Sequence, residues 1–489
     1  MESTTYTVRA EVSFEGVYPL SPSDLLIPPR AIRQAFIYRN DNQVETKEHT
    51  LIAALQESLK TFLKPLDKDK EPTETAYPQL LGRVVRPKDG SPPHVAVDES
   101  SSIPFTVVRR PDIIFADLSP AQRFPEERIQ KTNFAIGLDD SDLLSKHNFA
   151  VQLTFIEGGY VLVVQIHHAI TDGYGYAGFV RQWLQMTKAL IADGLYEEAV
   201  PQMSIHDKSE LLRDIDESPT AVEELNGLKT WEALYKEAST TAKANKNPLM
   251  GNNGIQSKIF WLSPESLESL RAKMHSHTED RPTIFESVMA HAWQCLARAR
   301  ADSNTVVETT ISNGFFAADI RNRLVPRLAT DYFGNAVTPV VARVPLSTLL
   351  LQQHRDIIKP IQSTLRTDTT DRNLRAINAL IFRQTKAGIF PPGNLLEQDV
   401  FFNSWEHLYP SLEAMEIGVG KFCIMRNLMD SPITPSYVLV MPSYGMRQTS
   451  SSDGASYRYP GGIELKVHLL QHQMERLVED DEWLHYVSI

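Results

Sequence analysis

The sequence predicts a mixed α/β fold, an α+β arrangement of mixed sheets, in two halves. Three observations predict it. Short apolar or alternating runs bounded by turn residues indicate strands, longer runs with apolar residues at helical spacing indicate helices, and a polar stretch at 206–257 without strand signals separates two such regions. With 489 residues, 42% of them hydrophobic, the chain can build a large core and more than one domain.

Residues 1–205 form the first predicted domain. The stretch at 6–14 alternates loosely, as a strand does, and apolar residues at 48–63 follow helical spacing. Two strand pairs follow: "LLGRVVR" pairs with "HVAVD" around Asp89-Gly90, and "FAVQLTFIEGGYVLVVQI" folds back at its Glu-Gly-Gly. The last run, 160–166, is apolar at six of seven positions, which predicts a strand buried on both faces.

A helix and then a long crossover follow this buried strand. Phe179, Trp183, Met186 and Leu190 fall at i, i+4, i+7 and i+11, a helical stripe that ends near Asp193-Gly194. The crossover at 206–257 is rich in Asp, Glu, Lys, Ser and Asn, and we expect it to be partly helical.

Residues 258–489 form the second predicted domain. "KIFWLS" is strand-like, and its Ser263 is an N-cap followed by a proline at the first helical position. Thr283 and Glu286 make a capping box that opens a long helix. Further strands are predicted in "DYFGNAVTPVVARV", "SYVLVMPSY" and "GIELKVHLL", with a last helix in "QHQMERLVEDDEWL".

Charge and composition exclude several classes of protein. Lys and Arg number 49 against 61 Asp and Glu, a formal charge of -12, so we expect the surface to repel nucleic acid and anionic membranes. Cys295 and Cys423 are too few for a disulfide framework and suit a reducing compartment. The N-terminus lacks an apolar signal region, and no run reaches the roughly 18 to 20 apolar residues of a membrane span. The expectation is a soluble, cytoplasmic protein.

Two patterns overlap in "VVQIHHAITDGYGYAG" at 163–178. Gly173, Gly175 and Gly178 spell the dinucleotide fingerprint, which needs the first glycine directly after the strand and a second parallel strand after the helix. Six residues separate the strand from Gly173, and no strand signal follows the helix, so this reading is disfavoured. The alternative is that Gly175 and Gly178 let the start of the helix pack tightly on the sheet.

The second pattern, His168-x-x-x-Asp172-Gly173, suggests acid–base chemistry. His168 lies at the end of a rigid strand, and an imidazole with an ordinary pKa of about 6.5 is mostly neutral at cytosolic pH, as a general base must be. The alternatives are a core histidine for His168 and an N-cap for Asp172.

A metal site is not expected. His167 and His168 are adjacent on a strand and therefore point to opposite faces, and HExxH is absent. No GxSxG elbow is present, and Gly420-Lys421 lacks the other residues of a phosphate-binding loop.

At these residues the sequence resembles a known family. "HHAITDG" is similar to the HxxxDG active-site motif of the acyl-CoA-dependent BAHD acyltransferases, plant and fungal enzymes that acylate alcohols and amines of specialised metabolism. Condensation domains of peptide synthetases and chloramphenicol acetyltransferase share this motif. Further matches follow in the family's order along nearly the whole chain: "LSPSDL", "YPQLLGRVV", "FAVQLTFIEGG", "TIFESVMAHAWQCLARAR", "AADIRNRLVPRLATDYFGNAV", "NSWEHLYPSLEAMEIGVGKF" and "GGIELKVHLLQHQMERLVEDDEWLHYV".

One stretch departs from the family pattern. In the place of DFGWG the chain has Glu416-Ile417-Gly418-Val419-Gly420, which keeps an acid and both glycines but loses both aromatic residues. This loss indicates a divergent member of the family, and a fungal one. The stretch is a structural loop in the family.

The resemblance implies two chloramphenicol-acetyltransferase-like domains, joined by the crossover, with the active site in a channel between them. The C-terminal domain would carry DIRNR, YFGN and EIGVG. His168 would deprotonate the acceptor in a ternary complex without an acyl-enzyme. Asp172 would point away and pair with Arg321 or Arg323.

The resemblance also implies residues that stabilise the oxyanion formed at the thioester carbonyl and that leave room for the thioester arm. Asn403, Ser404 and Trp405 hold the places of a hydroxyl residue and a Trp in the family, and the Asn403 amide would donate to the oxyanion; core packing is the alternative for Trp405. Gly173 would leave room beside the base for pantetheine or substrate, or else serve as a permissive turn residue.

The predicted function is therefore an acyl-CoA-dependent O-acyltransferase, most simply an acetyltransferase. It would move an acyl group from CoA to a hydroxyl or amine of a small metabolite as a monomer, with acyl-CoA as co-substrate and with no metal or permanently bound cofactor. Two alternatives stay open: a carrier-protein-dependent condensation-type acyltransferase, and a non-catalytic metabolite-binding protein on the same fold.

Overall fold

The structure, a computed structural model, comprises two compact units. The first comprises Met1–Leu212, Ala329–Ala336 and Leu408–Asp430, and the second comprises Arg213–Leu328, Val337–His407 and Ser431–Ile489. The residues described are 1–25, 30–40, 45–64, 76–88, 91–119, 124–135, 146–193, 211, 226–241, 254–275, 281–302, 310–329, 332–351, 355–386, 398–409, 413–428, 436–443 and 461–488.

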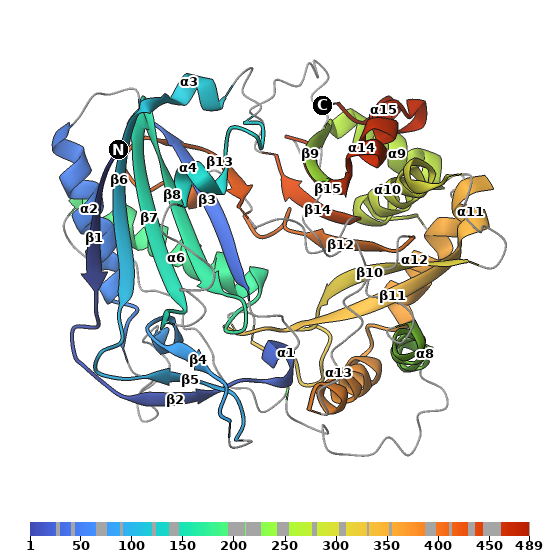
Figure 1. Cartoon of the computed structure of the whole chain (residues 1–489), viewed down its shortest axis with the longest axis horizontal. Coiled ribbons are helices and arrows are strands. Elements are labelled where there is room, and N and C mark those ends of the chain that lie inside the picture. Colours follow the sequence, from blue (N-terminus) through green and yellow to red (C-terminus); the bar gives the residue numbers. More distant parts are fainter. Residues whose placement is uncertain are drawn as a thin grey trace. The chain divides into compact units, whose positions relative to one another are not determined.

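A six-stranded mixed sheet forms the centre of the first unit (Figure 1). β6 and β7 run parallel, and the other neighbours are antiparallel. Every residue of β8 is buried, as the apolar run predicts. In sheet order the strands are β1 Glu2–Val8, β6 Ile103–Ile114, β7 Phe149–Glu157, β8 Gly159–His167, β3 Ala31–Arg39 and β13 Lys421–Asn427.

Two long helices, α2 (Glu45–Lys60) and α6 (Gly173–Asp193), pack against each other in this unit. The predicted stripe of α6 is buried at Phe179 and Trp183, and the indole nitrogen of Trp183 donates to the Leu55 carbonyl of α2 at 3.1 Å. The rest of the unit is a small sheet and short helices: β2 Gly16–Pro19, β5 His94–Val97, β4 Arg83–Val85, α1 Pro22–Leu25, α3 Phe115–Leu118, α4 Lys131–Phe134, and the 3₁₀ turns η1 Pro78–Leu80 and η5 Glu413–Met415.

The second unit contains another six-stranded mixed sheet (Figure 1). Both predicted helix starts are confirmed, because Ser263 Oγ accepts the Ser266 N–H at 3.0 Å and Thr283 and Glu286 form their capping box. The strands in sheet order are β11 Val337–Pro345, β10 Ile311–Asp319, β12 Val400–Ser404, β14 Tyr437–Pro442, β15 Ile463–Leu470 and β9 Ile255–Leu262. The helices are α8 Asn226–Thr241, α9 Pro264–His275, α10 Ile284–Arg300, α11 Leu346–Leu351, α12 Arg355–Thr367, α13 Asp371–Lys386, α14 Gln471–Leu477 and α15 Asp481–Tyr486.

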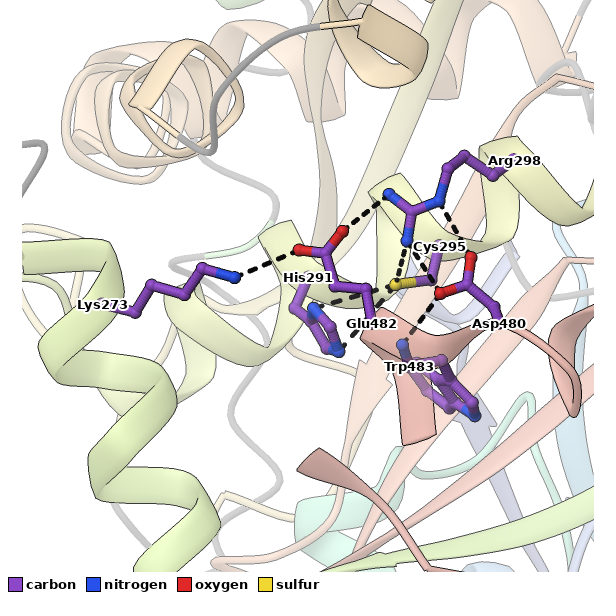
Figure 2. A network of polar contacts seen from close by, with 7 residues as sticks. All are labelled: Lys273, His291, Cys295, Arg298, Asp480, Glu482 and Trp483. Carbon is purple, nitrogen blue, oxygen red and sulfur yellow. Dashed lines mark hydrogen bonds and ion pairs between the residues drawn. The ribbon is translucent and has the colours of Figure 1, made fainter. Parts of the chain in front are cut away.

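A cluster of ion pairs and hydrogen bonds joins the segment 480–483, at the start of α15, to α10 (Figure 2). Arg298 donates to both carboxylate oxygens of Asp480, at 2.8 and 3.0 Å, and pairs with Glu482 at 3.1 Å. Asp480 also caps α15, accepting the Trp483 N–H at 2.9 Å. Burial raises the pKa of the adjacent Cys295 thiol, so this cysteine is a packed core residue and not a nucleophile.

Two predicted strands have different bounds in the structure. The strand predicted at 6–14 is β1, which ends at Val8, where its only described neighbour, β6, begins. The strand predicted from Asp331 begins at Val337, because carboxylates take up the backbone N–H groups of Asn335 and Ala336 just before it. The Asp89-Gly90 turn and most of the crossover lie outside the described residues.

The predicted domain boundaries stay a prediction. The two compact units differ from them in two respects. The predicted crossover is divided between the units after Leu212, and the segments 329–336 and 408–430, which hold YFGN and EIGVG, belong to the first unit and not to the second. Both segments reach the first unit by direct bonding, since β13 pairs with β3 and Ala336 binds Asp172.

Candidate active site at the end of strand β8

The backbone of His168 continues the edge of two paired strands. In the ladder between β3 and β8, Ala31 pairs with His167, and one residue further the His168 N–H donates to the Arg30 carbonyl at 2.8 Å. The His168 carbonyl accepts from the Asn335 side chain at 2.8 Å. The backbone of this residue is therefore held on both sides.

The two adjacent histidines have different environments. The His167 ring is buried, and its Nδ1 accepts the Ala169 N–H at 3.0 Å. Burial lowers the pKa of His167 to about 4, and repulsion from His168 in its protonated form and from the positive charge of Arg86 acts in the same direction. His167 is thus a neutral hydrogen-bond acceptor inside the fold, which leaves His168 as the candidate base.

The His168 imidazole is also held in its neutral form. Burial lowers its pKa to about 4, and the positive charge of Arg30 acts in the same direction. The carbonyl groups of His168 and Thr171 and the Asp172 carboxylate act the other way, but with smaller effect. Its Nδ1 is buried and has no hydrogen bond of ordinary geometry within the described structure.

Asp172 binds backbone N–H groups on two segments. One carboxylate oxygen accepts the Gly175 N–H at 2.9 Å, which makes Asp172 the N-cap of α6, and the other accepts the Ala336 N–H at 2.8 Å. The N-cap alternative is therefore confirmed. Because Asp172 joins the start of α6 to the segment 332–336, it fixes the turn that carries His168.

A second aspartate binds the same segment. Oδ1 of Asp24 in α1 accepts from the Asn335 backbone at 3.0 Å and from its side chain at 2.9 Å, and that side chain also donates to the His168 carbonyl. The other Asp24 oxygen accepts the Ser21 N–H at 2.7 Å. The "LSPSDL", "YFGN" and "HHAITDG" motifs thus meet in one buried network.

Two glycines of the pattern that resembles a dinucleotide fingerprint, Gly175 and Gly178, have different surroundings. A Cβ on Gly175 would lie 2.2 Å from Thr171 Oγ1, so a larger residue would displace the Thr171 side chain, while the Phe333 ring at 3.5 Å would be in ordinary contact. At Gly178 a Cβ would meet no heavy atom within 4 Å. The prediction of tight packing on the sheet is therefore wrong for Gly178, and Gly175 packs against Thr171 and Phe333 instead.

The EIGVG segment is bonded to the central sheet of the first unit. The Tyr160 hydroxyl donates to the Val419 carbonyl, and Glu416 accepts the Phe422 N–H at 3.1 Å. Gly418 and Gly420 have φ of 84° and 69°, where glycine is favoured. Tyrosine and backbone contacts therefore hold this loop without the two aromatic residues of the family pattern.

The second unit holds the remaining predicted residues. Asn403 donates to the Tyr437 hydroxyl at 3.1 Å, and Trp405 is buried. The Ser404 hydroxyl is buried and has no hydrogen-bond partner within the described part of the chain. Arg321 is buried and donates to Asp319 at 3.1 Å. Arg323 donates to the Asp319 carbonyl at 3.1 Å and to Thr369. Pairing of either arginine with Asp172 stays a prediction, as does the role of Gly173 at the start of α6.

The described residues contain no group of three His, Cys, Asp or Glu side chains placed to hold a metal ion. Among the helices that can be described, none combines the length and the apolar character needed to cross a membrane.

The family model described as the transferase family matches residues 2–484, nearly the whole chain. The chain belongs to this family, the BAHD acyltransferases. Phenolic glucoside malonyltransferase 2 from Arabidopsis thaliana is 23% identical over 319 residues, which cover 65% of this chain and 64% of that enzyme. The match therefore spans less than two thirds of the plant relative.

A fungal protein and a solved structure match over almost their full length. Acyltransferase easC from Emericella nidulans is 21% identical over 99% of this chain and 98% of its own. The crystal structure of TRI101 from F. sporotrichioides, complexed with coenzyme A and T-2, has a TM-score of 0.68 at 17% identity and covers 97% of this chain and 99% of its own. This likeness shows that the BAHD acyltransferase fold is shared.

Sequence reasoning missed Asp24, Asn335 and Arg30 in this family member. Asp24 and Asn335 lie inside segments that resemble the family, but nothing local distinguishes them from ordinary turn residues. Their signal would have been burial, since both side chains are at most 1% exposed and buried polar groups need partners. The positive charge of Arg30 matters only because the ladder brings it beside His168.

Proposed function

We propose that this chain is an acyl-CoA-dependent O-acyltransferase that moves an acetyl group from CoA to a hydroxyl or amine of a small specialised metabolite. The observation that carries the proposal is the neutral imidazole of His168 at the end of a buried strand, with its backbone bonded on both sides. Membership of the BAHD family supports it, as does the similarity to proteins named malonyltransferase and acyltransferase. The TRI101 structure with coenzyme A supports the donor class.

In the proposed reaction His168 takes the proton from the acceptor as its oxygen or nitrogen attacks the thioester carbonyl. The carbon–sulfur bond then breaks, and the departing CoA thiolate takes that proton from the imidazolium. No covalent acyl-enzyme forms. General base catalysis of this kind contributes about 10² to 10⁴ in rate, and alignment of the two substrates supplies much of the remainder.

The low pKa of His168 fits both proton transfers. With a pKa of about 4, almost every molecule carries a neutral imidazole at pH 7, so the base needs no prior deprotonation. The imidazolium that forms is much more acidic than a thiol, whose ordinary pKa is about 8.5, so the proton passes readily to the leaving thiolate. A base with this pKa is weak, so the attack itself must depend on stabilisation of the oxyanion.

We assign Asp172 a scaffolding role. Its oxygens accept N–H groups of the α6 start and of segment 332–336, and this positions the turn between them. For the oxyanion we retain Asn403 as the donor. One of its two amide hydrogens binds Tyr437, and the other, which has no partner among the described residues, could bind a substrate. Asn403 and Ser404 are consecutive on β12 and point to opposite faces, so they cannot both serve.

The test is incubation with acetyl-CoA and a panel of hydroxylated metabolites, following free thiol and product mass. His168→Gln keeps the size and polarity of the side chain but has no basic nitrogen, so we expect turnover to fall about 10²- to 10⁴-fold. The matched control is His94→Ala, because the ring of that surface histidine binds only the Pro92 carbonyl among the described residues. Full activity of a folded His168→Gln variant would remove the base role.

The same assay separates the alternative functions. Turnover with free acetyl-CoA supports the proposal over a condensation-type enzyme that needs a carrier protein. Absence of both turnover and CoA binding by calorimetry would instead favour the non-catalytic metabolite-binding protein.

A further inference from the structure

Four side-chain rings lie in one row across the sheet of the second unit. Phe315 of β10 and Phe401 of β12 are stacked with centroids 6.5 Å apart, Phe401 and Tyr437 of β14 at 5.7 Å, and Tyr437 and His468 of β15 at 5.6 Å. The planes of successive rings differ by 13°, 17° and 24°. We call these four residues the ring row.

Strand register explains the row. Phe315 pairs with Phe401 and Phe401 with Tyr437, while the pairing of Val438 with Val467 sets Tyr437 beside His468. Side chains in one register row point to the same face of a sheet. Asn403 lies two residues beyond Phe401 on β12 and therefore shares that face, and it donates to the Tyr437 hydroxyl.

Two properties distinguish the ring row from a packed apolar core. Phe401 and Tyr437 are only half-buried, although they stand in the middle of the sheet. His468 is 5% exposed, and neither of its ring nitrogens has a hydrogen-bond partner among the residues that the structure describes. Burial, together with the charge of Lys466, lowers the pKa of His468 well below its ordinary value, so the ring is neutral and one nitrogen can accept. An unpaired buried polar group is costly, so a ligand that completes its bonding gains from it.

Flat rings in a row favour a flat ligand. Because neighbouring rings of the row stack on one another, the half-buried Phe401 and Tyr437 present their edges to a ligand. The face of an aromatic ring can pack on such edges, whereas a puckered aliphatic ring of the same size has no π face to offer. A hydroxyl on the ligand ring would provide the hydrogen bond that His468 lacks.

We propose that the ring row is a specificity site for the acyl acceptor and that it selects alcohols or amines bearing a flat, hydroxylated aromatic ring. This inference rests on the proposed function and on Asn403 lining the reaction site. The acceptor carries the ring because the proposed donor, acetyl-CoA, has an acyl group without one.

The first test compares 2-phenylethanol with 2-cyclohexylethanol, which share one carbon skeleton but carry a flat aromatic ring and a puckered saturated ring, respectively. We expect the wild type to favour the phenyl alcohol in kcat/KM with acetyl-CoA, and Phe401→Leu to reduce that preference about 2- to 10-fold. The matched control is Phe285→Leu, since Phe285 is a half-buried ring of α10 that packs against Phe316, on the opposite face of β10. This control should retain the wild-type preference.

The second test concerns His468. The variant His468→Phe keeps the row flat but removes both nitrogens. The wild type should favour 2-(4-hydroxyphenyl)ethanol over 2-phenylethanol, and this variant should lose that preference. A preference that persists in the variant overturns the role of His468.

Binding measured without catalysis separates this inference from the proposed function. Saturation-transfer NMR detects each alcohol on the protein whether or not it is acetylated. If acetyl transfer fails but the phenyl alcohol binds through Phe401, the proposed function fails and the ring row stands. Equal binding of the phenyl and cyclohexyl alcohols to the wild type overturns the inference. So does a Phe401→Leu variant that changes the choice between benzoyl-CoA and acetyl-CoA and leaves the choice of acceptor unchanged.

Discussion

The scaffolding role of Asp172 makes a sharp prediction for the substitution Asp172→Asn. The wild-type carboxylate accepts two backbone N–H groups, from Gly175 and from Ala336. Asparagine offers only one acceptor oxygen. Because Asn is as good an N-cap as Asp, the oxygen should stay with Gly175 and turn the amide NH₂ toward Ala336, where two donors then face each other.

The magnitude follows from this single exchange. A hydrogen bond to a charged group contributes about 1.5 to 3 kcal/mol, and an unpaired buried N–H costs about 1 to 3 kcal/mol. Because the two figures describe one event, we expect a loss of about 2 to 3 kcal/mol in the free energy of unfolding. Asp172→Ala also removes the cap and should cost about 1 kcal/mol more.

Urea unfolding measures the total loss, and hydrogen exchange locates it. The amide of Ala336 should lose protection in Asp172→Asn, while the amide of Gly175 keeps it. The control is Asp98→Asn, because Asp98 is also a carboxylate that accepts a backbone N–H, from Ser100 at 3.0 Å, but it lies in a surface turn of the same unit. Its change should cost less than about 1 kcal/mol. Unchanged protection of Ala336 in a variant with wild-type stability would refute the scaffold.

Three further predictions follow from the same geometry. Asn335→Ala removes the bonds to Asp24 and to the His168 carbonyl; we expect kcat to fall about 10²-fold with KM and the pH profile unchanged, and a drop confined to KM would contradict the positioning role. In the wild type, kcat/KM should decrease only as pH falls through about 4, where His168 becomes protonated. A decrease in kcat/KM near the ordinary histidine pKa of about 6.5, in protein that remains folded by circular dichroism, would show that the pKa of His168 is not lowered. Burial opposes ionisation of Asp480, but the bonds from Arg298 and Trp483 outweigh it and hold the pKa of Asp480 low. This stabilisation is complete above the unfolded value of about 3.9 and is lost as pH falls through the lower folded value. Arg298→Met should therefore be about 1 to 3 kcal/mol less stable than the wild type at pH 7, and the difference should narrow as pH falls below about 3.9, as acid and urea titrations would measure.

Several elements of both units were predictable because their sequence signals are local. The apolar run at 160–166 indicates a buried strand, and the position of His168 one residue beyond the end of β8 follows from it. The caps at Ser263 and Thr283 are also local, since a capping side chain binds an amide three residues away.

Long-range partners could not be predicted in this way. Asp24 and Asn335 are 311 positions apart, and their contact depends on how two segments meet in the folded unit. The same limit explains the predicted strand at Asp331. Its residues have strand character, but carboxylates from elsewhere in the chain bind the amides of Asn335 and Ala336 and delay the strand to Val337. The ring row likewise depends on register between strands, which no single run of residues specifies.

The spacing of the HxxxD motif has a geometric reason in this chain. His168 must be bonded at the strand end, to Arg30, while Asp172 must cap a helix that begins at the next residue. Three residues between them suffice for one turn, which the Ile170 N–H closes on the His167 carbonyl at 3.1 Å. An added residue would move the cap off α6 or the base off the ladder, because each end is fixed by its own backbone bonds. The acid therefore acts on the base through the chain that joins them, and changes to Asp172 should alter where the imidazole lies more than how strongly it binds a proton.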